Sequence, residues 1–216
     1  MDLHNKTILF LGDSITEGYG VSEPSKRYAD IAAKELGATA VNYGVSGTRI
    51  ARQHAFNPDE RHDRDFIMRA EQMQREADLI VVFGGTNDYA HGDAPFGCFA
   101  DRTPMTFYGA LHTLYTYLTE TFVGVPVVVI TPLHRTNEDN GQVTRSNDYR
   151  PLKDYVDAIR EVAEYYSFPV LDFFAASGIQ PNVEIIKQTY VPDGLHPNDA
   201  GHAIMAKKLV SFLKSL

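Results

Sequence analysis

A serine near the start of the chain stands where an apolar stretch gives way to a polar one. Ser14 lies in residues 12–16, Gly-Asp-Ser-Ile-Thr, directly after the apolar segment 8–11. This pattern is typical of a buried strand that delivers a side chain to a sharp turn. A serine hydroxyl is a weak nucleophile until an adjacent base removes its proton. Ser14 is therefore a candidate nucleophile only if other parts of the chain supply a base and donors for an oxyanion.

A candidate base and an orienting acid stand together near the other end of the sequence. Asp193 and His196 lie in residues 193–197, Asp-Gly-Leu-His-Pro. Imidazole titrates near neutral pH, so His196 can accept the proton of a serine hydroxyl. Its second ring nitrogen needs an acceptor that also stabilises the imidazolium, and Asp193 is placed to provide it. The sequence therefore predicts that Ser14, His196 and Asp193 act together.

Two further motifs offer hydrogen-bond donors. Acyl transfer develops negative charge on the former carbonyl oxygen, and donors that face this oxygen stabilise it. Gly44 lies in residues 42–47, Asn-Tyr-Gly-Val-Ser-Gly, and Asn87 lies in residues 84–88, Gly-Gly-Thr-Asn-Asp. The predicted donors are the backbone N–H groups of Ser14 and Gly44 and the side-chain amide of Asn87.

Each of these motifs also has a purely local interpretation. Ser14 and Glu17 form the Ser-x-x-Glu pattern of a helix capping box. Turns commonly contain glycines such as those at 44 and 47, and also the Asn-Asp and Asp-Gly pairs at 87–88 and 193–194. The His-Pro pair at 196–197 is typical of a helix start. For each motif alone the local interpretation is favoured, but their joint occurrence in this order favours a shared site.

The segments between the motifs alternate between strand-like and helix-like patterns. Apolar strands are predicted at 7–11, 38–42, 79–83, 125–131 and 169–173, and helices at 28–36, 65–76, 107–122, 149–166 and 197–216. Continuously apolar strands imply burial on both faces, and their alternation with helices implies parallel pairing. The expected fold is α/β, a three-layer α/β/α sandwich with about five parallel strands. Ligands bind beyond the carboxyl ends of such strands, so the motifs are expected to converge there.

Four motifs in this order resemble the SGNH hydrolases, also called the GDSL esterase/lipase family, over residues 12–197. The matching blocks are 12–16, the Gly44 turn, 85–88 and 193–197. The resemblance implies a flavodoxin-like sandwich, a triad of Ser14, Asp193 and His196, and an oxyanion hole of Ser14, Gly44 and Asn87. Ile15 stands where the family name has Leu. The resemblance leaves the substrate open, because the family covers esters of lipids, sugars, thiols and aryl alcohols.

Length and composition fit one domain across residues 1–216, since 44% hydrophobic residues suffice for a full core. The net charge of −8, without a Lys/Arg cluster, argues against nucleic acid as a partner. The single cysteine, Cys98, excludes an internal disulfide and fits a reducing compartment. No signal-peptide pattern and no apolar run of about 18 residues is visible. These features predict a cytoplasmic protein that does not associate with membranes.

Three further groups are interpreted as local structure. Four side chains could suggest a metal site, but their spacing matches no familiar ligand motif, so they are interpreted as polar surface: His54, Asp59, His62 and Asp63. His91 and His134 follow the third and fourth strands, where a loop role is favoured over a place on a pocket rim. Four aromatic residues are expected to pack in the core or in loops rather than to form a platform for sugars: Tyr89, Phe96, Phe99 and Phe107.

The sequence predicts a serine esterase that forms an acyl-enzyme on a small-molecule ester and needs no cofactor or metal. The polar loop 132–150 and the lack of a long apolar lid favour a short acyl group on a polar alcohol, such as an acetylated carbohydrate. The alternatives on the same triad are a lysophospholipase and a thioesterase. Two other classes are a non-catalytic binding module and a metal-dependent phosphoesterase built on Asp13, Asp88, Asp193 and His196.

Overall fold

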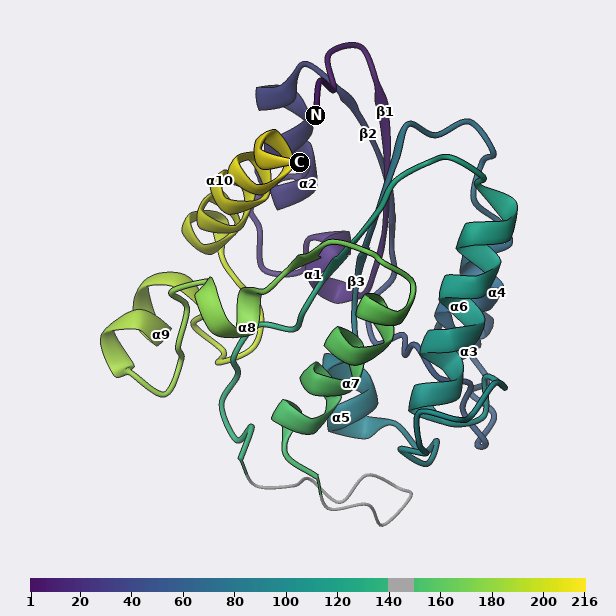
Figure 1. The fold of residues 1–216 in the computed structure, drawn as a ribbon. Helices are drawn as coiled ribbons and strands as arrows, with labels where there is room; N and C mark the ends of the chain where they lie inside the picture. Colours follow the sequence, from purple (N-terminus) through teal and green to yellow (C-terminus); the bar gives the residue numbers. More distant parts are fainter. Residues whose placement is uncertain (140–149) are drawn as a thin grey trace.

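The computed structural model describes residues 1–139 and 150–216, and its central feature is a five-stranded parallel sheet (Figure 1). The strands lie in the order β2-β1-β3-β4-β5. Their bounds are β1 (Thr7–Gly12), β2 (Thr39–Gly44), β3 (Leu79–Phe83), β4 (Val127–Ile130) and β5 (Val170–Leu171). The predicted α/β class is confirmed, and every strand boundary lies within two residues of its predicted position.

The central strands are buried on both faces because their side chains are almost all apolar. Along β1, Leu9 and Leu11 pack into one layer of the core, while Ile8 and Phe10 pack into the other. All four side chains are fully buried. Successive side chains of a strand point to opposite faces, so each face of this sheet presents apolar surface that helices must cover.

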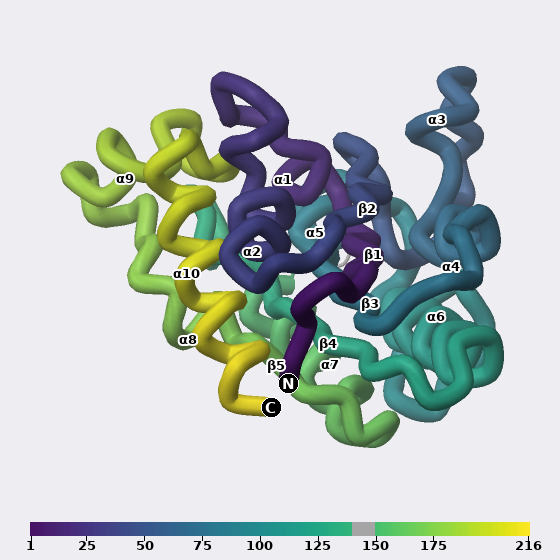
Figure 2. Tube along the Cα trace, turned by 90° about the horizontal axis from the view of Figure 1, so that it is seen from above, coloured from purple at the N-terminus to yellow at the C-terminus, as the bar shows by residue number. Residues whose placement is uncertain are grey.

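Helices cover both faces (Figure 2). One layer holds α2 (Tyr28–Leu36) and α10 (Asp199–Ser215), and the other holds α4 (Phe66–Ala70), α6 (Phe107–Thr121) and α7 (Leu152–Tyr165). The shorter helices are α1 (Ser14–Glu17), η1 (Pro24–Lys26), α3 (Glu60–Asp63), α5 (Thr86–His91), α8 (Phe173–Ala176) and α9 (Glu184–Tyr190). This arrangement confirms the predicted three-layer sandwich.

Helix α4 and strand β5 are less than half as long as the sequence predicts. Helix α4 covers only part of the predicted helix 65–76, although Met73 beyond its end still packs into the core with 3% of its surface exposed. The apolar spacing therefore continues through a turn, which the pattern alone does not distinguish from a helix. Strand β5 is short because Asp172 leaves the sheet and caps α8, where its carboxylate accepts the backbone N–H of Ala175 at 3.0 Å.

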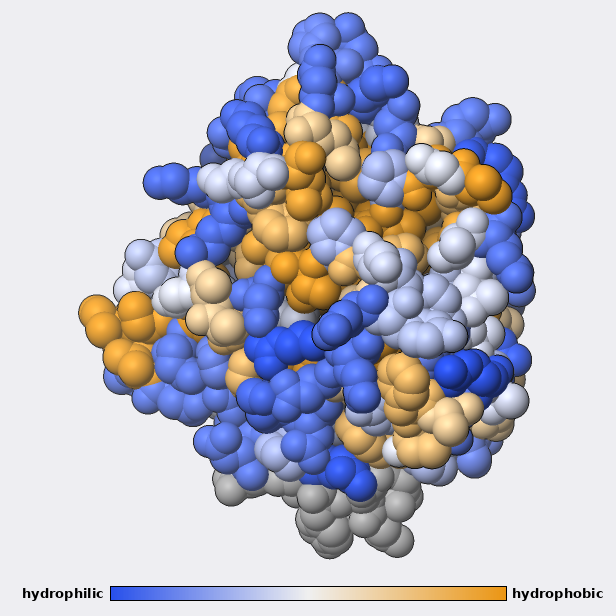
Figure 3. Space-filling model, in the orientation of Figure 1, coloured by the Kyte–Doolittle hydropathy of each residue, from blue (hydrophilic) through white to orange (hydrophobic). Residues whose placement is uncertain are grey.

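The surface carries an apolar patch over α9, at the left of Figure 3. Val183 and Ile185 are 49% and 66% exposed there, and α9 itself has no buried residue. Within residues 1–139 and 150–216, no helix is both long enough and apolar enough to cross a membrane.

Candidate active site

Ser14 is held at the carboxyl edge of the sheet by a short helix. Strand β1 ends at Gly12, and Asp13 is the N-cap of α1, with its carboxylate accepting the Ile15 N–H at 3.0 Å. Ser14 is the first residue of the helix, so its backbone N–H has no partner within the helix. The N-cap is therefore Asp13, and the capping-box interpretation of Ser14 and Glu17 is wrong.

Ser14, His196 and Asp193 form one hydrogen-bonded chain. The distance between Ser14 Oγ and His196 Nε2 is 3.0 Å, and His196 Nδ1 lies 2.7 Å from Asp193 Oδ2. A carboxylate only accepts, so Nδ1 carries the proton and Nε2 of the neutral imidazole accepts from the serine hydroxyl. The order of the three groups is the one that nucleophilic catalysis requires.

Asp193 is fixed in its ionised form by its own loop. Its Oδ1 accepts the backbone N–H groups of Leu195 and His196 at 2.9 and 2.7 Å. Partial burial raises the pKa of the Asp193 carboxyl, but these hydrogen bonds and the one from the imidazole outweigh it, so the pKa lies below its ordinary value. Asp193 is thus an anion at neutral pH and holds the orientation of His196.

The loop 191–198, which carries Asp193 and His196, is held by hydrogen bonds at its end and in its middle. Asn198 caps α10 by accepting the Gly201 N–H at 3.1 Å, and its amide donates to Thr189 O at 2.9 Å. The carbonyl of Gly194 accepts the Thr136 N–H at 2.9 Å. These bonds place the loop against the chain that follows β4.

A cavity of about 240 Å³ opens beside Ser14 and His196. The tilted ring of Tyr19 lies over the His196 ring, with 4.4 Å between their centroids. The residues that line the cavity are Ser14, Tyr19, Ser46, Gly47, Asn87, Ala90, His91, Arg135, Leu195 and His196. The sequence pattern did not indicate Tyr19 or Arg135 as residues of the site. For His91 the sequence favoured a plain loop role, but this side chain lines the cavity.

Asn87 presents its side chain to this cavity, as the sequence predicted. It follows β3 in helix α5 and is only 4% exposed. One N–H of its amide donates to Thr48 O at 3.0 Å, and its Oδ1 lies 3.1 Å from His91 Nε2. An amide carries two N–H groups, and the second has no acceptor among the residues that the structure describes.

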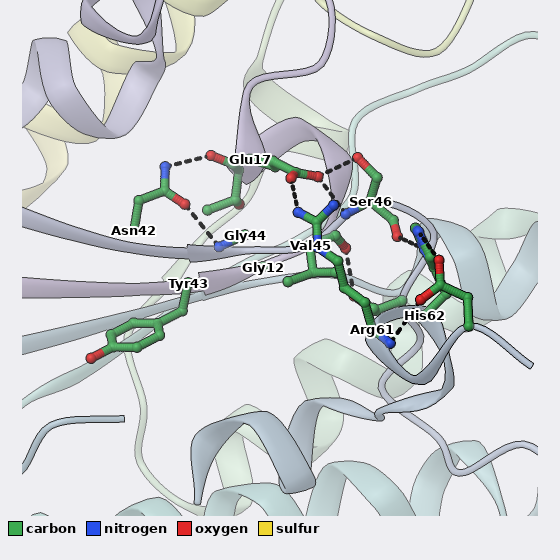
Figure 4. Close-up of polar contacts among 12 residues, drawn as sticks. Gly12, Glu17, Asn42, Tyr43, Gly44, Val45, Ser46, Arg61 and His62 are labelled. Carbon is green, nitrogen blue, oxygen red and sulfur yellow. Dashed lines mark hydrogen bonds and ion pairs between the residues drawn. The ribbon is translucent and has the colours of Figure 1, made fainter. Parts of the chain in front are cut away.

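Gly44 does not occupy the position expected of an oxyanion donor. Its N–H donates to Asn42 Oδ1 at 2.8 Å (Figure 4), and it does not line the cavity beside Ser14. A Cβ atom at Gly44 would lie 2.1 Å from the backbone nitrogen of Glu17. Position 44 therefore requires glycine because β2 and α1 approach closely. The prediction that Gly44 supplies an oxyanion donor conflicts with these contacts and is corrected here.

Gly47, three residues later, occupies the expected position instead. It lines the cavity together with Ser14 and Asn87, and its φ of 74° is in the left-handed region that favours glycine. Its backbone N–H has no acceptor within the described parts of the chain. The second glycine of the motif at 42–47 was the signal for this residue, but the spacing alone does not say which of the two faces the serine.

Two buried carboxyl groups beside the site have structural partners. Burial raises the pKa of Asp88 to about 7 and that of Asp13 to about 6. The two oxygens of Asp88 accept the backbone N–H groups of Ile50 and Ala51, each at 2.9 Å. Asp88 therefore fastens the chain after Gly47.

The described residues contain no group of three or more His, Cys, Asp or Glu side chains close enough together to hold a metal ion. Asp88 is engaged by the backbone, and Asp193 orients His196. The four residues of the phosphoesterase alternative are therefore not assembled as a ligand set.

The remaining candidates do not line the cavity beside Ser14. His62 Nδ1 donates to Ser46 O at 2.7 Å, and His134 pairs with Glu138 at 2.8 Å. The aromatic residues at 89, 96 and 107 are buried in the core, and Phe99 packs against it, as predicted. Of the polar loop 132–150, residues 140–149 lie outside the described residues.

A second cavity, of about 440 Å³, adjoins the first and shares Gly47 and His91 with it. Its wall includes most of segment 53–58, together with the polar side chains of Arg49, His62 and Asp93. Phe56 in this segment is 79% exposed. A ligand at Ser14 can therefore extend over a polar surface with one aromatic ring.

Comparisons with known proteins identify the family and the fold. The model of the GDSL-like lipase/acylhydrolase family matches residues 10–204. A crystal structure of a protein from Lactobacillus plantarum is 32% identical, covers 99% of this chain and 98% of its own, and has a TM-score of 0.83. A search of curated proteins found no match.

More distant solved structures share the fold. A lipase/acylhydrolase from Enterococcus faecalis is 21% identical, covers 97% of this chain and 96% of its own, and has a TM-score of 0.64. A two-domain esterase active on acetylated mannans is also 21% identical, covers 98% of this chain and 50% of its own, and has a TM-score of 0.64.

We expect Gly44→Ala to destabilise the protein by about 1–3 kcal/mol, because the new methyl group meets the backbone of α1 rather than a flexible side chain. Urea unfolding measures the change. The control is Gly124→Ala, since a Cβ at Gly124 meets nothing within 4 Å and only its φ of 80° is unfavourable. An unchanged unfolding midpoint for Gly44→Ala would contradict the close approach.

Proposed function

This chain belongs to the GDSL-like lipase/acylhydrolase family of ester-bond hydrolases, and we propose that it is a serine esterase with Ser14 as nucleophile. The observation that carries the proposal is the hydrogen-bonded chain from Ser14 Oγ through His196 to Asp193, with distances of 3.0 and 2.7 Å. Ser14 and His196 line a cavity whose wall also holds N–H donors without an acceptor among residues 1–139 and 150–216. A binding module has no need for either feature.

The proposed reaction has two halves. His196 Nε2 takes the Ser14 hydroxyl proton while Oγ attacks the ester carbonyl carbon, which gives a tetrahedral oxyanion. The C–O bond to the alcohol then breaks, and the alcohol leaves with the proton from His196. In the second half, a water molecule gives a proton to His196 and attacks the acyl-enzyme, and the acid leaves as Oγ regains its proton.

Three N–H groups support the oxyanion in this proposal: the backbone N–H of Ser14, the backbone N–H of Gly47 and the free N–H of the Asn87 amide. They come from α1, from the turn after β2 and from α5, and all three residues line the same cavity. Such donors, fixed before the reaction, contribute most where charge develops in the transition state. Gly47 replaces Gly44 in the oxyanion hole expected from the sequence.

The cavities support a short acyl group on a polar alcohol. The cavity beside Ser14 has a volume of about 240 Å³, below the roughly 300–1,000 Å³ of pockets for drug-sized ligands. The larger adjoining cavity has a polar wall with the exposed Phe56 ring. An acetylated carbohydrate would match both parts. The distant structural neighbour active on acetylated mannans is an esterase of the same fold with this kind of substrate.

Ser14→Ala tests the nucleophile. We expect kcat for p-nitrophenyl acetate to fall by roughly 10⁴-fold or more while the protein stays folded, because the covalent route is lost. Circular dichroism and labelling by a fluorophosphonate probe accompany the kinetics. Ser25→Ala is the control, since that serine is exposed on η1 and its hydroxyl donates to the nearby Glu23. A folded Ser14→Ala protein with near-wild-type activity would refute the assignment.

Acyl-chain length tests the small cavity. We expect kcat/KM on p-nitrophenyl esters to be highest for acetate or butyrate and to fall for longer chains. A long apolar tunnel would add about 0.8 kcal/mol of binding for each buried methylene, so rates would climb with chain length. An increase through octanoate to palmitate would contradict the prediction and favour the lysophospholipase or thioesterase alternative.

Phe56→Ala tests the adjoining cavity as the site of the alcohol part. We expect kcat/KM for an acetylated sugar to fall about two- to tenfold, which corresponds to about 0.5–1.5 kcal/mol for an aromatic contact. The value for p-nitrophenyl acetate should stay unchanged, because this ester carries no sugar part to contact the Phe56 ring. Val123→Ala, at an 82% exposed apolar position, is the control. Equal effects on both substrates would be inconsistent with a sugar contact at Phe56.

A further inference from the structure

The turn that presents the Gly47 N–H belongs to no helix or strand, so other contacts must fix its position. Ser46, the residue before Gly47, is bound by Glu17 (Figure 4). Glu17 Oε2 accepts both the backbone N–H of Ser46, at 2.7 Å, and its hydroxyl, at 2.5 Å. One carboxylate oxygen thus holds both the Val45–Ser46 peptide unit and the Ser46 side chain, directly before the peptide unit that carries the Gly47 N–H.

Glu17 and Ser14 lie on the same turn of helix. Ser14 is the first residue of α1 and Glu17 is the last. Helix α1 is itself packed against the end of β2, where Asn42 donates its amide N–H to Thr16 O at 2.6 Å. The candidate nucleophile and the anchor of the turn are therefore parts of one short rigid unit.

The opposite side of the turn is also held. His62 Nδ1 donates to Ser46 O at 2.7 Å, and the Val45 N–H donates to Gly12 O at 3.1 Å. Arg61, next to His62, pairs with the other oxygen of Glu17. Among the described residues, Glu17 binds the N–H and the hydroxyl of Ser46, and His62 binds its carbonyl, which shares a peptide unit with the Gly47 N–H.

Glu17 is ionised at neutral pH. Its partial burial raises the pKa of the carboxyl, but the hydrogen bonds from Ser46 and the contact with Arg61 outweigh it, so the pKa lies below its ordinary value. A depressed carboxyl pKa means that its contacts are fully present above the ordinary pKa. They are lost only as the pH falls through the lower value.

We propose that Glu17 is a positioning residue for the oxyanion hole: through Ser46 it fixes the Gly47 N–H relative to Ser14. This inference rests on the proposed esterase function. A donor displaced by a fraction of an ångström still permits substrate to bind but stabilises the transition state less. Replacement of Glu17 should therefore lower kcat and leave KM nearly unchanged.

The Arg61 ion pair is not the source of this effect. Its two side chains are 55% and 28% exposed, and ion pairs between exposed groups contribute little. Arg61→Met keeps both bonds from Ser46 to Glu17 and is expected to leave kcat within about twofold of wild type. A loss in Arg61→Met as large as in Glu17→Ala would overturn the assignment to Ser46.

The experiment compares Glu17→Ala and Glu17→Gln in steady-state hydrolysis of p-nitrophenyl acetate. Glu17→Ala is expected to lower kcat by about 10- to 100-fold with KM within about threefold, less than the loss of a whole donor. Glu17→Gln keeps an oxygen acceptor for Ser46 and should recover most of kcat. The control is Glu60→Gln, because the exposed Glu60 at the start of α3 pairs with Arg64 at the end of the same helix, and it should match wild type.

Two measurements keep the outcome decisive. Ser46→Ala removes only the hydroxyl bond and is expected to lower kcat by about threefold, which gives a second test should Glu17→Ala fail to fold. The NMR signal of the Gly47 amide, in protein without substrate, should broaden or shift in Glu17→Ala and stay unchanged in Glu60→Gln.

The two proposals fail in different ways. If the wild-type protein shows no Ser14-dependent hydrolysis, the proposed function fails, and the Gly47 signal alone then decides whether Glu17 holds the turn. If wild type is active but folded Glu17→Ala keeps its kcat, or loses activity through KM alone, the positioning role is overturned and the proposed function stands. An unchanged Gly47 signal in Glu17→Ala also overturns it.

Discussion

The hydrogen bond between Ser14 and His196 joins residues 182 positions apart, and the rest of the site depends on it. It forms because parallel strands deliver the segments that follow them to one edge of the sheet. Ser14 follows β1, Asn87 follows β3, and the loop 191–198 reaches the same edge before α10. The α/β sandwich therefore does more than provide a core, since no local segment of this chain could bring these groups together.

Buried polar groups keep that edge in place. The Arg69 guanidinium, on α4, donates to the carbonyls of Gly12 and Tyr43 and to the Thr48 hydroxyl, so a single cation binds the ends of β1 and β2 and the turn beyond them. Burial lowers its pKa to about 10, which still leaves it charged at neutral pH. A charge removed from water is tolerated where hydrogen bonds satisfy it, and here two of the bonds hold the backbone carbonyls at the ends of β1 and β2.

The sequence predicts the strands and the Ser14–His196–Asp193 chain because both depend on patterns that survive without coordinates: apolar runs, and functional residues placed after them. A prediction from sequence fails where the same residue pattern is compatible with two different local structures. Gly44 and Gly47 are equally plausible donors until the structure shows that one is pressed against α1 and the other lines the cavity. Glu17 suggests a cap on its own helix, whereas its carboxylate reaches Ser46 across the turn. Where a side chain points, and which residues it contacts, depends on the tertiary structure and is not contained in the local sequence pattern.

The wall of the larger cavity is fastened separately from the reacting groups. Segment 53–58 is held mainly through Asp93, whose carboxylate accepts the backbone N–H groups of His54 and Ala55 at 2.7 Å each. No bond of the Ser14–His196–Asp193 chain passes through this segment. Substitution of the exposed Phe56 side chain therefore leaves that hydrogen-bonded chain intact. Selectivity for the ester can therefore change, by natural drift or by directed evolution, while the hydrogen-bonded chain of Ser14, His196 and Asp193 stays the same.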